Sequence, residues 1–413
     1  MNERGGARRQ TSTIMTDPSS RSSRFPLGAA VELAELDRDP YPVFARLREK
    51  EPITWLPALN MWYVTRYEDV RTIILDTERF TTVSEHSLLL GTFGTHLLTT
   101  EGALHDRYRL AVQPHFSTSV IRNHFEVPIR IAAAELIKSF RFAGRIELRA
   151  AFARRLLIQA ILIACGLPVT AEPYIRQWYD SFEAALANFT LDPSVRLRAQ
   201  RDVAALHELL QSEIRPAAGP VDASLLAGLI NAPSGQRLGD DEIKRNLSII
   251  LFGGISTVEA LILNTLWALF EHPAVLSRLR ADLALLPQVL EETIRWLSPV
   301  QSATRHVVKD CEIAGVRLEA GATVNCMLGS ANRDPHIFPH PDSFDIGRTN
   351  LRRHLGFATG PHSCVGFNLA KSEARIAIEE LLALLPQFAR VGSESGPLRG
   401  YEFRQPAALA IGW

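Results

Sequence analysis

One cysteine of this chain stands in a sequence context that suits cofactor ligation. Cys364 belongs to residues 357–366, FATGPHSCVG, and the helix-like run FNLAKSEARIAIEELLALL follows directly. The positive end of that helix points back at the loop, where it would stabilise a thiolate and lower the thiol pKa. Gly360 and Pro361 favour a tight turn, and Gly366 removes side-chain bulk near the sulfur. A thiolate among small residues suits a flat cofactor better than it suits a nucleophile.

A charged pair lies in an apolar helical segment. In LEETIRW, Glu292 and Arg295 are three residues apart, so they share one face of a helix. An exposed ion pair is the common interpretation of such spacing. The apolar neighbours of this pair favour burial instead, and a buried pair needs further partners.

Two adjacent glycines occur within residues 241–271, the most apolar helical pattern in the chain. Gly253 and Gly254 each cost about 1 kcal/mol in a helix relative to alanine. They allow either close helix packing or the approach of something flat or small to the backbone. Ser256 and Thr257 follow at once and supply hydroxyl groups beside that gap.

Cations that could bind an anion occur in two further motifs. His105 and Arg109 are four apart in LHDRYRL, so one helix face could present both to the same anion. Arg305 lies in the strand-like segment SATRHVV. Taken singly, each of these residues is expected on the surface.

The elements that must position these residues are mostly helices. Residues 105–145 and 148–215 show long helical patterns with short breaks, 241–271 read as one long helix, and 287–297 as another. Short β-branched runs separated by turns predict strands within 302–328. Residues 329–357 are irregular and rich in Pro and Asp, as functional loops often are.

Composition narrows the class of protein. The 413 residues carry 45 Lys+Arg and 45 Asp+Glu, so the neutral chain has no global basic footprint for nucleic acid or anionic membranes. Its 4 cysteines form no CxxC pair, which predicts a reducing compartment without disulfides. Residues 1–25 lack the apolar region of a signal peptide and are expected to form a disordered lead. No apolar run reaches the roughly 18 residues of a membrane span, so a soluble cytoplasmic protein is expected.

The order of these motifs resembles the cytochrome P450 family. The chain presents HxxxR, a glycine-broken helix ending in Thr, ExxR, a strand Arg, ANRDP and then FxxGxHxCxG. The resemblance covers essentially all of residues 30–413. It implies the cytochrome P450 fold, mainly α with a smaller β portion, as a single unit over residues 26–413. It also implies haem b as cofactor, with Cys364 as the axial ligand of the iron.

The resemblance assigns roles to further positions. The expected haem-binding residues are Cys364, His105, Arg109, Arg305, His362, Phe357, Gly253, Thr359 and Gly366, of which His105, Arg109, Arg305 and His362 would hold the propionates. The expected catalytic residues over the distal face are Thr257, Ser256 and Gly254. The expected buried structural group is Glu292, Arg295 and His354. The substrate pocket is expected at segment 84–98, the distal helix, 300–303 and 401–403 under helices near 170–190, with Leu89, Leu97, Ile249, Val300, Ala303 and Phe403 as lining residues.

The sequence departs from the family pattern at three positions. Ala358 stands where a second loop glycine is usual, and Lys371 where arginine is common. Ser256 replaces the acid that usually precedes the distal threonine and helps to relay protons. Glu259 is a poor substitute, because two residues along a helix place it nearly opposite Thr257.

The expected activity is a haem-thiolate monooxygenase that inserts one oxygen atom from O2 into a small apolar or aromatic molecule, by hydroxylation or O-dealkylation. The chain shows no flavin or iron–sulfur module, so a ferredoxin and its reductase are expected in trans, with docking cations among Arg107, Arg352, Arg353 and Lys371. No nucleic-acid or membrane partner is expected. Two alternatives stay open: a peroxygenase driven by hydrogen peroxide, which the missing acid favours, and a non-catalytic haem or ligand-binding protein.

Overall fold

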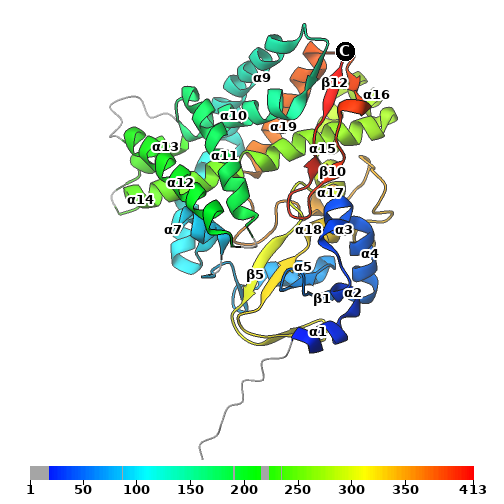
Figure 1. Cartoon of the computed structure of the whole chain (residues 1–413). Coiled ribbons are helices and arrows are strands. Elements are labelled where there is room, and N and C mark those ends of the chain that lie inside the picture. The colour runs from blue at the N-terminus through cyan, green and yellow to red at the C-terminus, as the bar shows by residue number, and fades with distance from the viewer. Residues whose placement is uncertain (1–17, 86, 189–190, 215–222, 234) are drawn as a thin grey trace, which may run out of the picture.

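The protein is mainly helical with small sheets, as the sequence predicts. The computed structural model describes residues 18–85, 87–188, 191–214, 223–233 and 235–413. Helices fill one side of the molecule, and the largest sheet lies on the other side beside the N-terminal helices (Figure 1). The helices that precede the sheet or pack on it are α1 Pro18–Arg24, α2 Pro26–Ala29, α3 Leu33–Arg38, α4 Pro40–Lys50, α5 Tyr67–Leu75 and α18 Leu328–Ala331.

The main sheet carries one of the cations singled out in the sequence. Its strands run in the order β1-β2-β8-β5-β3, and only β2 and β8 pair in parallel. Arg305 of β5 lies opposite Val324 of β8. The strands are β1 Ile53–Leu56, β2 Met61–Val64, β3 Phe80–Thr81, β5 Ala303–Val307 and β8 Thr323–Cys326. The smaller sheets contain β4 Arg145–Glu147, β6 Cys311–Ile313, β7 Val316–Leu318, β9 Ala389–Arg390, β10 Leu398–Arg399, β11 Gln405–Pro406 and β12 Ala410–Gly412.

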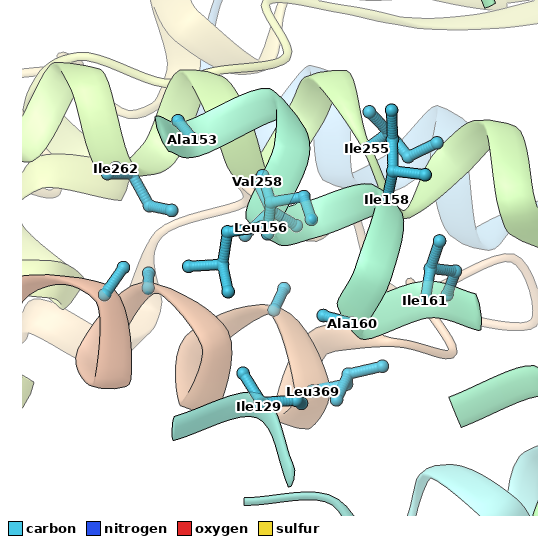
Figure 2. Packing of buried hydrophobic residues seen from close by; sticks show 14 of the residues in the cluster. Ile129, Ala153, Leu156, Ile158, Ala160, Ile161, Ile255, Val258, Ile262 and Leu369 are labelled. Carbon is cyan, nitrogen blue, oxygen red and sulfur yellow. The ribbon is translucent and has the colours of Figure 1, made fainter. Parts of the chain in front are cut away.

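The large apolar core includes buried faces of α9 Glu126–Phe140, α10 Arg154–Cys165, α15 Ser256–Glu271 and α19 Phe367–Leu384, and further helices extend it. Figure 2 shows Leu156 of α10 in one apolar cluster with Val258 of α15 and Leu369 of α19. The other helices are α6 Leu88–Phe93, α7 Gly102–Val112, α8 Thr118–Val120, α11 Glu172–Leu186, α12 Pro193–Glu213, α13 Leu225–Ile230, α14 Asp240–Gly253, α16 Pro273–Ala281 and α17 Leu286–Trp296.

The expected single helix over 241–271 is instead two helices, α14 and α15, separated by Gly254 and Ile255. By length and composition, the run Asp240–Glu271 could cross a membrane, but 78% of its most apolar window is buried inside the protein. It is therefore a core element, and its apolar surface is covered by other helices.

Two segments differ from the sequence-based expectation. Residues 18–24, placed in a disordered lead, form helix α1 because Arg21 pairs with Glu319 at 2.6 Å and lies over the ring of Trp55. The segment 84–98, expected as a loop, contains helix α6, capped by the Ser87 hydroxyl. Residues 1–17 of the expected lead, position 86 and positions 189–190 lie outside the described residues.

Candidate functional site

The cysteine loop is closed by backbone and side-chain contacts. The Cys364 N–H donates to the Phe357 carbonyl at 2.9 Å, which brings the two ends of the loop together. Arg109 of α7 donates from Nη1 to the Ser363 carbonyl at 2.5 Å and from Nη2 to its hydroxyl at 3.3 Å. Gly360 has a φ of +73°, and a Cβ there would meet Leu75 Cδ2 at 3.0 Å. The loop therefore holds Cys364 at a fixed place before α19.

Cys364 is the most accessible of the four cysteines: Cys165 and Cys326 are buried, Cys311 is partly exposed and Cys364 is exposed. Desolvation by surrounding protein nevertheless raises the pKa of the Cys364 thiol, against the opposing effects of the Gly366 N–H and the Arg109 charge. Burial of the Cys364 thiol therefore opposes the lowering of its pKa that the helix end and Arg109 favour. The Cys364 thiol is thus accessible although surrounding protein desolvates it.

Glycines leave room for a bulky group at two places. A Cβ at Gly366 would meet no atom within 4 Å, and the same holds for Gly253. Gly254 differs, because a Cβ there would meet Ile161 Cδ1 of α10 at 2.8 Å. Gly254 thus allows close packing against α10, while Gly253 presents open backbone; the expected place of Gly254 over the distal face stays a prediction.

A histidine pair lies beside the cysteine loop. The rings of His105 and His362 are 4.4 Å apart between centroids, and His362 Nε2 lies 2.9 Å from Glu101 Oε2. Burial alone would raise the pKa of Glu101, but hydrogen bonds from His362 and the Thr82 N–H lower it to about 2. His105 Nε2 and His362 Nδ1 are buried and have no hydrogen-bond partner. Two orphaned ring nitrogens in one cluster suit the anionic groups of a missing ligand.

Arg305 is buried, with 6% of its surface exposed, and its Nη1 donates to the Thr304 carbonyl at 2.8 Å. Burial lowers its pKa, and the charge of Glu101 partly opposes that effect. Glu101 contacts His362, and its charge also acts on Arg305. Glu101 therefore connects this cation to the histidine pair.

The break between α14 and α15 exposes a hydroxyl and hides its neighbour. Thr257 Oγ1 donates to the Gly253 carbonyl at 2.7 Å, and the contact is solvent-exposed. Ser256 is buried, and its backbone N–H donates to the Tyr179 hydroxyl at 2.9 Å. Glu259 is fully buried and paired with Arg149 and Arg154. Because both arginines bind its carboxylate, Glu259 is a poor substitute for an acid at position 256.

The expected burial of Glu292 and Arg295 agrees with the structure. Both side chains are 0% exposed, and they are joined by two hydrogen bonds of 2.7 Å. Arg295 also donates to the carbonyl oxygens of Asn332, Pro341 and Ser343. These contacts give a buried pair the additional partners that it requires.

The third partner of this pair is Arg348, and the expected assignment of His354 is wrong. Arg348 Nε lies 3.1 Å from Glu292 Oε1. His354 Nε2 contacts Glu291 Oε2 at 2.7 Å instead, and Lys371 joins the same carboxylate at 3.0 Å. Adjacent residues on a helix point roughly 100° apart, so Glu291 and Glu292 face different partners.

The expected pocket residues fall into two groups. Leu97 and Ile249 are buried in the large helical core, and Leu89 packs against it. Val300 and Phe403 form an isolated antiparallel bridge, while Ala303 packs at the edge of the sheet core. The remaining loop residue Thr359 is partly exposed.

Three residues that sequence reasoning missed complete the site: Glu101, Tyr179 and Arg348. Each acts through a partner far along the chain, 261 residues for Glu101 and His362, 77 for Tyr179 and Ser256, and 56 for Arg348 and Glu292. Of the three, only Arg348 lies in the irregular segment 329–357 that the sequence pattern associates with function. No local pattern distinguishes the other two.

These residues fit a haem group. The described part of the chain holds no cluster of three or more His, Cys, Asp or Glu that could bind a metal alone. Haem supplies most of the ligands of its iron, so a single thiolate such as that of Cys364 could complete the set. The open space at Gly253 and Gly366 admits a flat group, and the orphaned histidine nitrogens suit its carboxylates.

Comparison with known proteins identifies the family. A cytochrome P450 family model matches residues 199–385. The chain is 32% identical over 398 residues to the cytochrome P450 monooxygenase PikC of Streptomyces venezuelae, covering 91% of each chain. It is 31% identical to cytochrome P450 107B1 of Saccharopolyspora erythraea, over 86% of this chain and 90% of that one.

Solved structures agree in fold. CalO2 superposes with a TM-score of 0.83 at 27% identity, over 92% of this chain and 97% of CalO2. P450BioI superposes with a TM-score of 0.82 at 27% identity, over 92% of this chain and 100% of P450BioI. That structure is a complex with an acyl carrier protein ligated to hexadec-9Z-enoic acid. The similarity to these proteins extends over most of the chain, and the cysteine loop, the buried ion pair and the broken helix occur in the expected order. The chain therefore belongs to the cytochrome P450 family.

Proposed function

We propose that this cytochrome P450 monooxygenase inserts one oxygen atom of O2 into a small apolar or aromatic organic molecule, by hydroxylation or O-dealkylation. The observation that carries the proposal is the accessible Cys364 thiol on a loop fixed by Arg109, beside two buried histidines with unpartnered ring nitrogens. The cytoplasm is the proposed location, because the helical run Asp240–Glu271 is a buried core element.

Haem b is the proposed cofactor, with Cys364 as axial ligand and His105, Arg109, Arg305 and His362 holding its propionates. When bound, thiolate-ligated haem supplies the reduction of O2 and the cleavage of its O–O bond. The chain itself must then bind the substrate, exclude bulk water and deliver protons.

Proton delivery is assigned to Thr257. Its hydroxyl hydrogen is given to the Gly253 carbonyl, so its oxygen lone pairs remain free to hold a water on the open side. Among the described residues, no carboxylate bonds to this hydroxyl, and Glu259 is engaged by two arginines. Thr257 Oγ1 can therefore pass a proton along but cannot store one, because hydroxyl pKa values are too high.

The substrate class is inferred from the apolar residues Leu89, Leu97, Ile249, Val300, Ala303 and Phe403. A structural neighbour at 26% identity and a TM-score of 0.81 is described in complex with (4-ethylphenyl) dihydrogen phosphate. The ethylphenyl ring of that ligand and the acyl chain in the P450BioI complex are apolar groups, although the first also carries a phosphate and the second a carrier protein.

A ferredoxin and its reductase are the proposed electron donors. Of the four docking cations expected from the sequence, Arg107 pairs with Glu242 at 2.8 Å and Lys371 with Glu291 at 3.0 Å, so both charges are largely compensated. Arg352 and Arg353 are exposed and make the better docking candidates.

The test is reconstituted turnover in isotopically labelled O2 with a surrogate ferredoxin, a reductase and reduced nicotinamide. The proposal expects one labelled oxygen atom in a hydroxylated product, or in the aldehyde released by O-dealkylation when it is trapped before it exchanges with water, and no product without the redox proteins. A hydroxylated product whose new oxygen comes from water, or no product at all across apolar and aromatic substrates, would overturn it.

A peroxygenase is the second candidate, favoured by the serine at position 256 in place of an acid. In that case hydrogen peroxide alone would drive turnover at least as fast as the complete redox system. The same substrate panel run with peroxide and without redox proteins separates the two functions.

A further inference from the structure

A tyrosine hydroxyl occupies the place of one backbone hydrogen bond in the distal helix. In a continuous α-helix, the N–H of Ser256 would donate to the carbonyl of Phe252, four residues earlier. Here the Tyr179 hydroxyl lies between them: it accepts from the Ser256 N–H at 2.9 Å and donates to the Phe252 carbonyl at 3.1 Å. A side chain inserted into the ladder in this way is a recognised cause of a helix break.

Tyr179 is held rigidly enough to act as a wedge. It is 1% exposed, and its ring stacks on Phe252 with centroids 5.4 Å apart and planes at 19°. The Arg154 guanidinium lies 5.7 Å from the ring centroid. Burial raises the pKa of Tyr179 far above its usual value, so the hydroxyl keeps its proton and remains a donor to Phe252.

The break has a direct consequence for Thr257. The next carbonyl along, that of Gly253, accepts the Thr257 hydroxyl at 2.7 Å, and both groups face the accessible side. On the opposite side, Ile161 of α10 packs against Gly254. The carbonyl that accepts the Thr257 hydroxyl thus lies directly at the break that Tyr179 supports from inside the core.

Tyr179 also connects this kink to the helices proposed to cover the substrate. It belongs to α11, which packs against α6, and Phe182 of α11 contacts Phe93 of α6 edge-on at 5.3 Å. Leu89, a proposed pocket residue, lies on the same α6. A shift of α11 would therefore reach the kink through the Tyr179 hydroxyl as well as through the stacking of its ring on Phe252.

We propose that Tyr179 is a positioning residue that holds the α14–α15 break open and so sets the orientation of the Thr257 hydroxyl, with α11 as the element that it couples to. This inference rests on the proposed role of Thr257 in proton delivery. A plain packing role would depend on the Tyr179 ring, whereas this proposal assigns the orientation of Thr257 to the Tyr179 hydroxyl.

Tyr179→Phe tests this distinction, since it keeps the ring and removes only the hydroxyl. Tyr174→Phe is a matched control on the same helix, because Tyr174 is 58% exposed and stacks on Trp178. Hydrogen exchange of the haem-loaded proteins, followed in peptides spanning residues 248–260, reports on the backbone without requiring turnover. We expect Tyr179→Phe to change the exchange of this segment by about tenfold, the effect of one hydrogen bond, and Tyr174→Phe to leave it unchanged.

Coupling, the product formed per reduced nicotinamide, provides the second readout. Tyr179→Phe should lower coupling at unchanged haem content, but it should have no further effect in a Thr257→Ala background, because both changes act through the same hydroxyl. Additive losses in the double variant would overturn the proposal, as would unchanged exchange in Tyr179→Phe. If the exchange differs while no variant turns over, the wedge stands and the proposed oxygenase function fails.

Discussion

Glu292 and Arg295 form a two-point ion pair in which neither side chain is exposed to solvent, with 2.7 Å between each nitrogen and its oxygen. The pair lies on α17 and anchors three backbone carbonyls of the irregular segment that leads to the cysteine loop. It is thus a structural element that organises the chain leading to Cys364.

Glu292→Ala or Arg295→Ala should yield little folded haem protein, because each leaves a buried charge without its partner at a cost of roughly 3–5 kcal/mol. The matched control is the exposed pair Glu135 and Lys138, which has the same i,i+3 spacing on α9. Loss of that pair should cost about 0.5 kcal/mol or less. Soluble yield, haem content and thermal unfolding of the variants measure the difference, and equal effects of the two pairs would contradict the account.

Ala358→Gly should stabilise the protein. Ala358 has a φ of +54°, a left-handed conformation that costs a residue with a side chain roughly 1–2 kcal/mol. Glycine relieves this strain but loses more chain entropy on folding, about 0.5–1 kcal/mol, so the net gain should be about 0.5–1 kcal/mol. Ala204→Gly, at an exposed position in the interior of α12, should have the opposite sign. Chemical denaturation of both variants provides the comparison, and destabilisation by Ala358→Gly would refute the strain argument.

Glu291 should make stability depend on acid pH. Burial tends to raise its pKa, but His354 and Lys371 outweigh that effect and lower the pKa from 4.5 to about 2. A carboxylate with a lowered folded-state pKa contributes stability that is complete above pH 4.5 and is lost as the pH falls toward 2. Glu291→Gln should therefore flatten the decline of unfolding free energy across this window. Parallel curves for the two proteins, from denaturant unfolding at stepped pH, would show that Glu291 does not carry the effect.

Thr257→Ala should lower coupling and release more hydrogen peroxide, while haem content and substrate binding stay as they are, since the hydroxyl contacts only the Gly253 carbonyl among described residues. Ser256→Asp should raise coupling provided that the new carboxylate is hydrated and leaves the helix packing intact, since Ser256 is buried and an unhydrated charge there would lower the folded yield. It adds a proton-storing carboxylate at the first residue of α15, where the helix dipole favours negative charge. Product formed per reduced nicotinamide consumed is the measurement, and equal coupling in Thr257→Ala and the parent would remove Thr257 from the proton path.

Much of the fold and the order of the site residues could be predicted from local pattern. The loop around Cys364 and the burial of Glu292 with Arg295 follow from neighbouring residues, as does the change from helices to strands near residue 302. The glycine pair was harder: Gly253 and Gly254 look alike in sequence, but only Gly254 meets Ile161.

The remaining features depend on partners that are distant in the chain. The choice of His354 between Glu291 and Glu292 depends on how α17 is rotated, which spacing does not specify. The wedge of Tyr179 requires knowing that α11 lies beside the break in the distal helix. The sign of the Cys364 pKa shift depends on how much protein surrounds the loop, and the helix end alone predicts the opposite sign.

The central claim, that Cys364 is the axial ligand of haem iron, is tested most directly by the absorption spectrum of the reduced, carbon-monoxide-bound protein. The parent protein should show the band typical of thiolate-bound haem. Cys364→Ser should lose that band, and Cys326→Ser, at a buried cysteine of β8, should keep it. If Cys364→Ser retained the thiolate band, another residue would be the ligand and the account of the site would be wrong.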